Sequence, residues 1–270
     1  MSARVLVFDS GLGGLTVAGC IQRQMPGVVL SYLADTAGFP YGDRSAGDVM
    51  TRCIGRISEG VKETGADLVV IACNTASTLV LPRLRERLTV PVVGVVPAIK
   101  PAAAVSENRR IGILATPATV RRPYTDRLID NFAPDCHVVR LGLSDMVRWA
   151  EDSVPGAAPD RSTLRRALAP LIEAEVDTVV LGCTHYPLLA GSLSEALPEV
   201  RHWVDSGDAI ARRVRFLLDG EGLLGEAPVS GPPAPLGLCF TGPVPEGLPC
   251  LLERVGLAAG SLLSDEPGCG

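Results

Sequence analysis

The chain has 270 residues, a net charge of −5 and a sequence pI near 5.3. This acidic balance argues against a protein that coats nucleic acid or an anionic membrane. Hydrophobic residues make up 47% of the chain and charged residues 20%, values typical of globular proteins and not of disordered ones. The length leaves room for two domains of ordinary size.

Nothing in the sequence predicts export or insertion into a membrane. The first apolar run, residues 4–8, is too short for a signal peptide. No uninterrupted apolar stretch approaches the roughly 20 residues that a membrane span needs. We therefore expect a cytoplasmic protein with neither a membrane nor a nucleic acid as its partner.

The cysteines argue for free thiols and against a metal site. Eight of them are scattered along the chain, at positions 20, 53, 73, 136, 183, 239, 250 and 269, and none forms a CxxC pair. In a reducing compartment such thiols stay free, and most are expected to pack as small buried hydrophobes. The spacing does not predict a zinc site, so no metal is expected.

The predicted elements alternate between strand and helix along almost the whole chain. In the first part, strands are predicted at 4–8, 28–34, 68–72 and 92–96, with a helix that ends near residue 26 and helices at 45–64 and 77–88. After a boundary near 97–104, strands are predicted at 110–115, 137–141, 178–181 and 203–204, and helices at 119–132, 145–151, 162–175 and 188–197. The last part is predicted as a helix at 207–218, a Gly- and Pro-rich linker at 221–235, a strand at 236–241 and a helix at 246–255. This alternation predicts an α/β protein with two parallel sheets.

One stretch of the sequence occurs twice. Residues 66–77 read ADLVVIACNTAS, and residues 176–187 read VDTVVLGCTHYP. In each copy an Asp precedes a buried apolar run, and a small residue, a Cys and two polar residues follow it; the two cysteines, Cys73 and Cys183, lie 110 residues apart. In open α/β sheets ligands bind where strands end. A lone Cys at such a place is usually structural, but two matched ones favour a function, in which two thiols face one ligand.

Two other segments are candidates for binding. Residues 9–17, DSGLGGLTV, do not fit the dinucleotide pattern, because Thr16 stands where a third glycine belongs. Alone they predict a tight turn into a helix, in which Ser10 and backbone N–H groups could bind a carboxylate. Pro40-Tyr41-Gly42 lies in a loop long enough to reach a site, and by itself it is also consistent with an ordinary turn.

Together these segments resemble the signature blocks of the glutamate racemases, which belong to the cofactor-independent aspartate/glutamate racemase superfamily. The resemblance lies in residues 8–17, 40–42, 72–77 and 181–189. It implies two pseudo-symmetric α/β domains, residues 1–97 with 207–270 and residues 98–206, with the active site in the cleft between them.

The resemblance also assigns roles to single residues. Cys73 and Cys183 match the two catalytic acid/base positions, Asp9 and His185 match the groups that assist them, and Glu151 matches a third helper. The substrate-binding positions match Asp9, Ser10, Tyr41, Gly42, Asn74, Thr75, Thr184 and His185.

The implied activity is the interconversion of L- and D-glutamate, which supplies D-glutamate for peptidoglycan, without pyridoxal phosphate or a metal. Inverting an α-carbon requires removal of a proton on one face and delivery on the other, which explains why two thiols would be needed. Residues 93–101 resemble the branch whose members respond to a cell-wall precursor, so such an activator is a further expected partner, and homodimers are common in the family.

Other readings of the sequence predict different activities. An aspartate or hydantoin racemase of the same superfamily would use the same thiols on a different substrate. A non-catalytic amino-acid binding module would bind a ligand without exchanging its α-hydrogen, and it gives no reason for two matched cysteines. A cysteine hydrolase would leave the second thiol idle.

Overall fold

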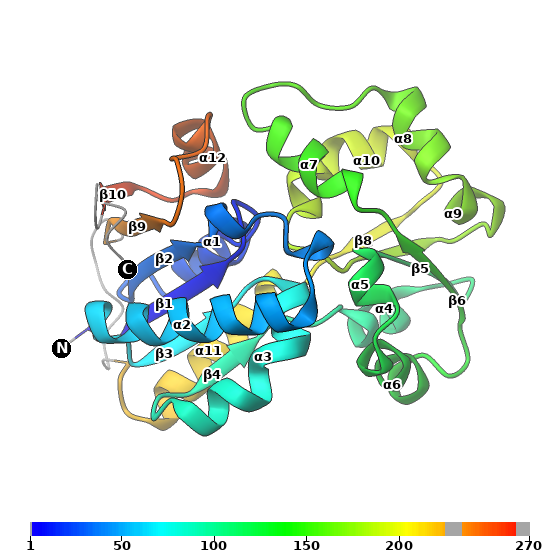
Figure 1. The fold of residues 1–270 in the computed structure, drawn as a ribbon. Helices are drawn as coiled ribbons and strands as arrows, with labels where there is room; N and C mark the ends of the chain where they lie inside the picture. The colour runs from blue at the N-terminus through cyan, green and yellow to red at the C-terminus, as the bar shows by residue number, and fades with distance from the viewer. Residues whose placement is uncertain (1, 225–233, 263–270) are drawn as a thin grey trace. The chain divides into compact units, whose positions relative to one another are not determined.

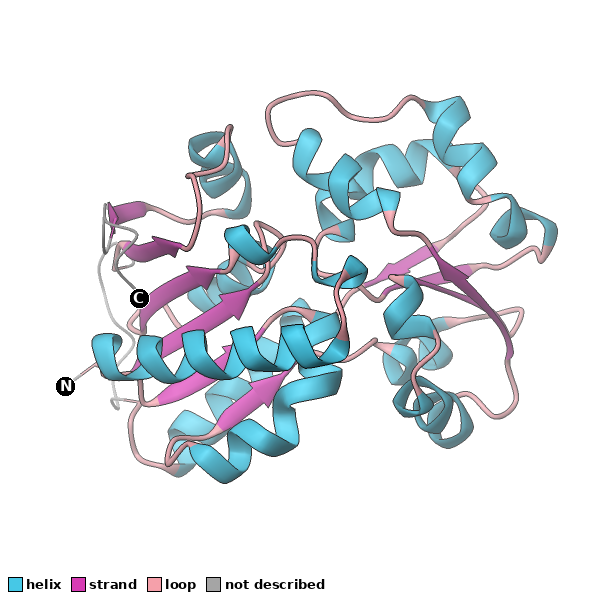
Figure 2. Cartoon of the chain, in the orientation of Figure 1, coloured by secondary structure: helices cyan, strands magenta, loops and turns pink. Residues whose placement is uncertain are grey.

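The computed structural model describes residues 2–224 and 234–262, and the chain divides into two compact units (Figure 1). Unit 1 comprises Met1–Val95 and Gly207–Gly270, and unit 2 comprises Val96–Ser206. Each unit is built on its own parallel sheet with helices beside it (Figure 2).

The sheet of unit 1 has the strand order β10-β9-β2-β1-β3-β4, and every neighbouring pair is parallel. Its strands are β1 (Arg4–Asp9), β2 (Val29–Ala34), β3 (Leu68–Ile71), β4 (Val92–Gly94), β9 (Leu236–Phe240) and β10 (Ala259–Leu262). All four residues of β3 are buried, as expected of a central strand with helices on both faces.

The α-helices of unit 1 are α1 (Leu15–Gln24), α2 (Ala46–Thr64), α3 (Asn74–Arg87), α11 (Gly207–Gly220) and α12 (Leu248–Val255), and two short 3-10 turns are η1 (Thr36–Gly38) and η2 (Tyr41–Asp43). The sequence sets the ends of α2: the Ser45 side chain caps its first turn by accepting from the Asp48 amide, and Gly65 ends it with a left-handed φ of 60°. Its buried positions, among them Cys53 and Ile57, pack with α3 on β1 and β3.

The sheet of unit 2 has the strand order β6-β5-β7-β8 and is also entirely parallel. Its strands are β5 (Arg110–Ala115), β6 (His137–Gly142), β7 (Thr178–Leu181) and β8 (His202–Val204). Its helices and turns are α4 (Ile99–Val105), α5 (Pro117–Val120), α6 (Pro123–Phe132), α7 (Asp145–Asp152), α8 (Arg161–Ala167), α9 (Ala169–Glu173), η3 (Tyr186–Leu189) and α10 (Ala190–Ala196). Helices α4 and α6 pack together over buried side chains of β5 and β7.

The same four-strand core occurs in both units. The order β2-β1-β3-β4 in unit 1 matches β6-β5-β7-β8 in unit 2, so β3 and β7, which carry the repeated sequence, take equivalent central positions. The first residue after each of these strands makes the same hydrogen bond: the Ala72 amide donates to the Phe8 carbonyl at 2.8 Å, and the Gly182 amide donates to the Leu114 carbonyl at 2.8 Å. The predicted α/β fold class with two parallel sheets is confirmed.

Several predicted helices differ in detail from the observed ones. The predicted helix 119–132 is two helices, α5 and α6, because Pro123 lacks an amide hydrogen and begins α6. The predicted helix 162–175 is divided between Ala167 and Ala169, where Pro170 begins a new turn. The segment 97–104, predicted as a boundary, contains α4, and most of the predicted linker 221–235 lies outside the described residues.

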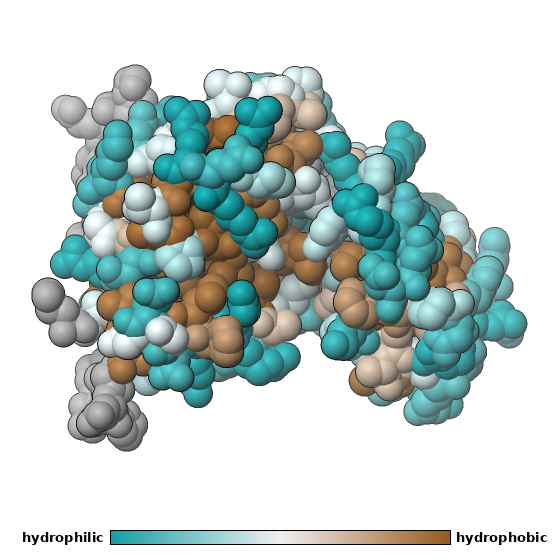
Figure 3. Space-filling view, turned by 90° about the horizontal axis from the view of Figure 1, so that it is seen from below, coloured by the Kyte–Doolittle hydropathy of each residue, from teal (hydrophilic) through white to brown (hydrophobic). Residues whose placement is uncertain are grey.

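Hydrophobic residues are visible between hydrophilic ones on the face shown in Figure 3. The large hydrophobic side chains that are exposed in the described ranges are Val105, Phe132, Phe216 and Val244. No helix within residues 2–224 and 234–262 combines the length and the apolar character that crossing a bilayer requires.

Candidate active site

The first candidate thiol lies where β3 passes into α3. Cys73 has extended backbone angles, φ −65° and ψ 116°, and its carbonyl accepts from the Ser77 amide, so the helix begins with the next residue. The residue is 6% exposed. Its Sγ lies 3.7 Å from the Ser10 hydroxyl, at hydrogen-bonding distance for sulfur. The repeated sequence therefore places a thiol and a hydroxyl together at the carboxyl ends of β3 and β1.

Asp9 is the last residue of β1 and is fully buried. Its neighbour Phe8 is paired with Ile71 of β3, so Asp9 lies at the same edge of the sheet as the first thiol. One carboxylate oxygen accepts from the Gly11 amide at 2.9 Å, which folds the chain back into a tight turn. The Tyr32 hydroxyl on β2 stabilises this turn by donating to the Gly11 carbonyl at 2.6 Å.

Asn74 and Thr75 form the first turn of α3 and are 4% and 5% exposed. The Asn74 side-chain oxygen is buried and accepts no hydrogen bond from any described residue. Buried polar atoms without partners are rare in folded proteins, because each costs about 1–3 kcal/mol. The unpaired amide oxygen beside Cys73 is therefore best explained by a ligand or a water molecule that completes its hydrogen bonding.

Tyr41 makes a buried hydrogen bond that the sequence does not predict. Its hydroxyl donates to the Asp35 carboxylate at 2.7 Å, and the residue is 2% exposed. Burial, and then the neighbouring Cys53 and Asp35, raise the pKa of Tyr41 far above its ordinary value, so the phenol stays neutral. Because the hydroxyl is already engaged, the Tyr41-Gly42 segment can offer a ligand its backbone rather than its phenol.

The second candidate thiol, in unit 2, belongs to a chain of three polar groups. Cys183 Sγ lies 3.9 Å from Nδ1 of His185, and Nε2 of the same ring lies 2.9 Å from the Glu151 carboxylate. His185 is 2% exposed, and the Glu151 side chain is 19% exposed. Since a carboxylate accepts, the Nε2 atom carries a proton, and in the neutral ring Nδ1 then faces the thiol as an acceptor. The Thr184 hydroxyl lies 3.4 Å from the same Nδ1 atom.

Glu151 comes from α7, which packs against η3 directly after the thiol. A second contact ties the two segments together: the Tyr186 hydroxyl donates to the Leu143 carbonyl at 2.6 Å, just before α7 begins. Burial, and then the charge of Cys183, raise the pKa of Tyr186 well above its ordinary value. Sequence patterns predict neither this hydrogen bond nor the one between Glu151 and His185, because each joins residues that are far apart in the sequence.

The predicted site residues therefore form two groups, each within one unit. Asp9, Ser10, Cys73, Asn74 and Thr75 gather at the carboxyl edge of the unit 1 sheet. Glu151, Cys183, Thr184 and His185 gather in unit 2. No three His, Cys, Asp or Glu side chains of the described ranges are arranged to hold a metal ion.

A cavity of about 450 Å³ in unit 2 contains none of the predicted site residues. It is lined by residues such as Asn108, Asp177 and Arg201, which precede β5, β7 and β8, so it lies at the amino ends of these strands. Ligands of open parallel sheets bind at the opposite, carboxyl ends. The thiol groups, and not this cavity, are therefore the better candidates for chemistry.

Comparisons with known proteins show the family of this chain. A family model described as Asp/Glu/Hydantoin racemase matches residues 16–214. A glutamate racemase of Shewanella frigidimarina is 46% identical over 264 residues, which is 98% of this chain and 99% of the relative. The crystal structure of Escherichia coli glutamate racemase in complex with L-glutamate and the activator UDP-MurNAc-Ala superposes with a TM-score of 0.85 at 42% identity, over 96% of this chain and 97% of that one.

A Picrophilus torridus aspartate racemase shares the fold alone, with a TM-score of 0.53 and 19% identity over 82% of this chain and 95% of that one. The family match, the full-length identity and the duplicated strand–cysteine core all lead to one assignment. This chain belongs to the Asp/Glu/Hydantoin racemase family of isomerases.

Proposed function

We propose that this protein interconverts L- and D-glutamate by proton transfer through Cys73 and Cys183, without a cofactor. The observation that carries the proposal is the duplication itself: in each unit the equivalent central strand is followed, after one small residue, by a buried cysteine with polar groups beside it. Glutamate is favoured as the substrate because relatives at 46% and 42% identity over nearly the whole chain are glutamate racemases.

The chemistry requires two groups that differ in protonation. One thiolate removes the α-proton from one face of the substrate while one thiol delivers a proton to the other face, and the opposite enantiomer reverses the roles. A single base would have to cross the plane of the intermediate. A placed acid or base contributes about 10²–10⁴-fold to the rate, so the rest of the acceleration comes from charge stabilisation in a site that excludes water.

In unit 2, His185 and Glu151 adjust the protonation of Cys183. A protonated imidazole 3.9 Å from the sulfur favours the thiolate, and the Glu151 carboxylate at 2.9 Å orients the ring and stabilises its positive charge. The same ring can return a proton when Cys183 acts as the acid. His185 and Glu151 thus serve as assisting groups for the second thiol.

In unit 1, Ser10 and Asp9 have different tasks. The Ser10 hydroxyl at 3.7 Å can donate to a Cys73 thiolate. The Asp9 carboxylate cannot favour that thiolate, because a negative charge opposes a second one nearby. Asp9 instead accepts a proton, orients Cys73 or binds the substrate ammonium group, and its full burial makes an opposite charge favourable there.

The substrate has two carboxylates, and the site groups supply neutral donors for them. These donors are the side chains of Ser10, Asn74, Thr75 and Thr184 and the backbone of Tyr41 and Gly42. His185, the other predicted binding residue, can donate to a carboxylate only when its Nδ1 atom is protonated, because its Nε2 atom bonds Glu151. A carbanion next to a carboxylate needs strong stabilisation, and in this proposal fixed hydrogen-bond donors and dipoles provide it in place of pyridoxal phosphate or a metal.

The proposal also includes an activator, a second copy of the chain as partner, and the cytoplasm as the location. A cell-wall precursor of the kind bound in the Escherichia coli structure activates the enzyme, which comparison of the rate with and without UDP-MurNAc-Ala tests. The protein forms a homodimer, which sedimentation velocity tests. It acts in the cytoplasm and supplies D-glutamate for peptidoglycan, and the free thiols of the described cysteines suit a reducing compartment.

The direct test is chiral chromatography of L-glutamate incubated with the pure protein and no added cofactor. D-glutamate is expected to accumulate until the two enantiomers are equal. In deuterated water, the newly formed enantiomer should carry deuterium while the recovered starting enantiomer stays protiated at early times. Early label in both enantiomers contradicts the two-base mechanism. Turnover of aspartate or a hydantoin with none of glutamate contradicts the substrate, and binding of glutamate without exchange of its α-hydrogen contradicts the activity.

A further inference from the structure

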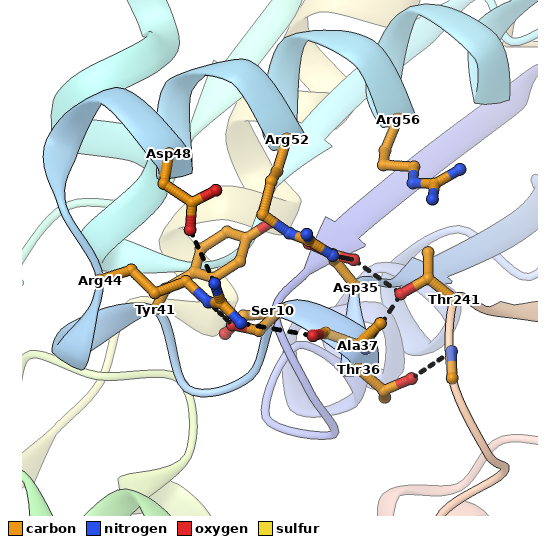
Figure 4. A network of polar contacts seen from close by, with 12 residues as sticks. Ser10, Asp35, Thr36, Ala37, Tyr41, Arg44, Asp48, Arg52, Arg56 and Thr241 are labelled. Carbon is orange, nitrogen blue, oxygen red and sulfur yellow. Dashed lines mark hydrogen bonds and ion pairs between the residues drawn. The ribbon is translucent and has the colours of Figure 1, made fainter. Parts of the chain in front are cut away.

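The Asp35 carboxylate is the centre of a buried polar network in unit 1 (Figure 4). Asp35 follows β2 and is 0% exposed. Arg52 of α2 binds it with two nitrogens, Nε at 2.6 Å and Nη2 at 2.8 Å. The Tyr41 hydroxyl donates to it at 2.7 Å, and the Thr241 hydroxyl donates to it at 2.6 Å. Three side chains, from the β2–α2 loop, from α2 and from the segment after β9, therefore meet at one carboxylate.

Thr241 connects the C-terminal part of the chain to this network. It follows β9, and it is 206 residues away from Asp35 in sequence. Its hydroxyl also accepts from the Ala37 amide at 3.1 Å, and the Gly242 amide donates to the Thr36 hydroxyl at 2.9 Å. The loop between β2 and α2 is thus fixed on one side by the helix and on the other by the segment after β9.

Arg44 fixes the far end of the same loop. Its guanidinium donates to the carbonyls of Gly38 and Ala37 and forms an ion pair with Asp48 at 2.7 Å. A side chain at position 38 would displace the ion pair, because a Cβ there would lie 2.3 Å from an Asp35 oxygen and 2.5 Å from Arg52 Nε. Side-chain hydrogen bonds therefore hold the loop at residues 36–38, 41 and 44.

We propose that Asp35, Arg52 and Thr241 are positioning residues that hold the Tyr41-Gly42 segment in the conformation that binds substrate. This inference rests on the proposed function, which uses the backbone of that segment as a substrate contact. A fully paired buried network rigidifies the segments that it joins. Here it fixes the Tyr41 ring and thereby the peptide groups beside it, so substrate binding depends on a threonine 200 residues further along the chain.

Thr241→Val and Thr241→Ser test the proposal most cleanly. Valine has the shape of threonine but neither donates to Asp35 nor accepts from Ala37, whereas serine keeps both hydrogen bonds. Thr241→Val is expected to raise KM for glutamate about fivefold and to leave kcat within about twofold, because uniform binding is lost rather than transition-state stabilisation. Thr241→Ser is expected to restore the KM of the unchanged enzyme to within about twofold.

Arg52→Met gives a second measurement, with Arg140→Met as its control. Both changes remove an Arg–Asp ion pair, but the pair of Arg140 with Asp126 joins β6 to α6 in unit 2, whereas the loop between β2 and α2 belongs to unit 1. Arg52→Met is expected to raise KM by at least as much as Thr241→Val, and Arg140→Met is expected to leave KM unchanged. An unchanged KM in Thr241→Val, or an equal rise in the Arg140 control, overturns the proposal.

Hydrogen exchange separates this proposal from the proposed function. Thr241→Val is expected to accelerate amide exchange in a peptide covering residues 36–45 and to leave a peptide from unit 2 unchanged. This readout needs no turnover, so it is informative even if the unchanged protein does not racemise glutamate, a result that would overturn the proposed function alone. Unchanged exchange in residues 36–45 overturns the positioning role whatever the activity.

Discussion

The two thiols are chemically equivalent but lie in different surroundings. Cys73 is beside a hydroxyl and near a buried carboxylate, whereas Cys183 is beside an imidazole that is itself paired with Glu151. Cys183 thus has a group beside it that can exchange a proton, whereas Cys73 has a hydroxyl donor and the start of α3.

Replacing either thiol should abolish net racemisation. Cys73→Ser and Cys183→Ser are each expected to lower the rate of D-glutamate formation by at least about 10³-fold, because a serine hydroxyl is a far weaker acid and base than a thiol. Chiral chromatography measures the rate, and circular dichroism checks the fold. Cys250→Ser, which changes an exposed thiol on α12, is the matched control and should keep full activity. Activity in both site variants would exclude the two-thiol mechanism.

Removal of the charge on Glu151 should slow the reaction without unfolding the protein. Glu151→Gln keeps a hydrogen-bond acceptor near His185 but no longer stabilises a protonated ring, so a fall in kcat/KM of about ten- to a hundredfold is expected. Because the two enantiomers are equally stable, kcat/KM should fall by the same factor in both directions. Asp152→Asn, at the next and exposed position of α7, is the control. Equal kinetics in the two variants would show that Glu151 has no assisting role.

The protonation of Asp35 should make the free energy of unfolding depend on pH in the acidic range. Burial alone raises the pKa of Asp35, but hydrogen bonds from Arg52, Thr241 and Tyr41 outweigh it and hold the pKa below 3.8, its ordinary value. Its stabilising contribution is therefore present above pH 3.8 and is lost as the pH falls through the lower, folded-state pKa. Urea unfolding at several pH values should show stability falling below about pH 4.

The matched variant for this pH dependence is Asp35→Asn. It removes the titrating group, so it should unfold more easily at neutral pH and lose less stability on acidification than the unchanged protein. The acid loss should not vanish, since hydrogen bonds to Asp177 in unit 2 also outweigh its burial and lower the pKa of that carboxylate. An acid loss as large in Asp35→Asn as in the unchanged protein would contradict the assignment to Asp35.

At the scale of elements, the two copies of the strand–cysteine sequence continue differently. Cys73 is followed at once by α3, a helix of 14 residues, so the thiol lies at the positive end of a helix dipole. Cys183 is followed by the four-residue 3-10 turn η3 and then by α10. The helix dipole of α3 can stabilise negative charge at Cys73, and a protonated His185 can stabilise it at Cys183. Similar strands therefore lead to two different ways of stabilising negative charge.

Close packing at the start of α1 should make the protein sensitive to a side chain at Gly14. A Cβ at Gly14 would lie 2.8 Å from the Cβ of Asp9 and 3.0 Å from that of Ala72, both next to the first thiol group. Gly14→Ala is therefore expected to destabilise the protein by about 1–3 kcal/mol and to lower activity. Gly55→Ala is the control, with an effect of opposite sign. Gly55 lies inside α2 with open space around it, so alanine there should stabilise the folded protein by about 0.5–1 kcal/mol. Thermal unfolding of the two variants measures both effects.

At the scale of the whole molecule, the chain passes between the units twice, after Val95 and after Ser206. Unit 2 is one continuous segment inserted into unit 1, whose last strands, β9 and β10, extend a sheet begun near the N-terminus. The Asp35 network depends on this return, because Thr241 is supplied by the part of the chain after the insertion. The C-terminal part of unit 1 therefore acts on the loop next to the candidate site and does more than complete the sheet.

The sequence by itself determined the fold class and the placement of two cysteines just after equivalent strands, because both depend on local patterns. Buried parallel strands are continuous apolar runs, and a residue directly after such a run lies at the carboxyl edge of its sheet whatever the rest of the chain does. The repeat of that pattern indicated that Cys73 and Cys183 are equivalent. The resemblance added Glu151 as a candidate, but no periodicity connects it to His185.

Only the tertiary structure decided which distant side chains meet. The 2.9 Å contact between Glu151 and His185, the engagement of the Tyr41 hydroxyl by Asp35, and the link from Asp35 to Thr241 all join segments that are separate in sequence. Such contacts depend on strand order, helix packing and loop path, which no local propensity encodes. A hydrogen bond needs its two groups placed to within a few tenths of an ångström, and that placement arises only when the whole unit has folded.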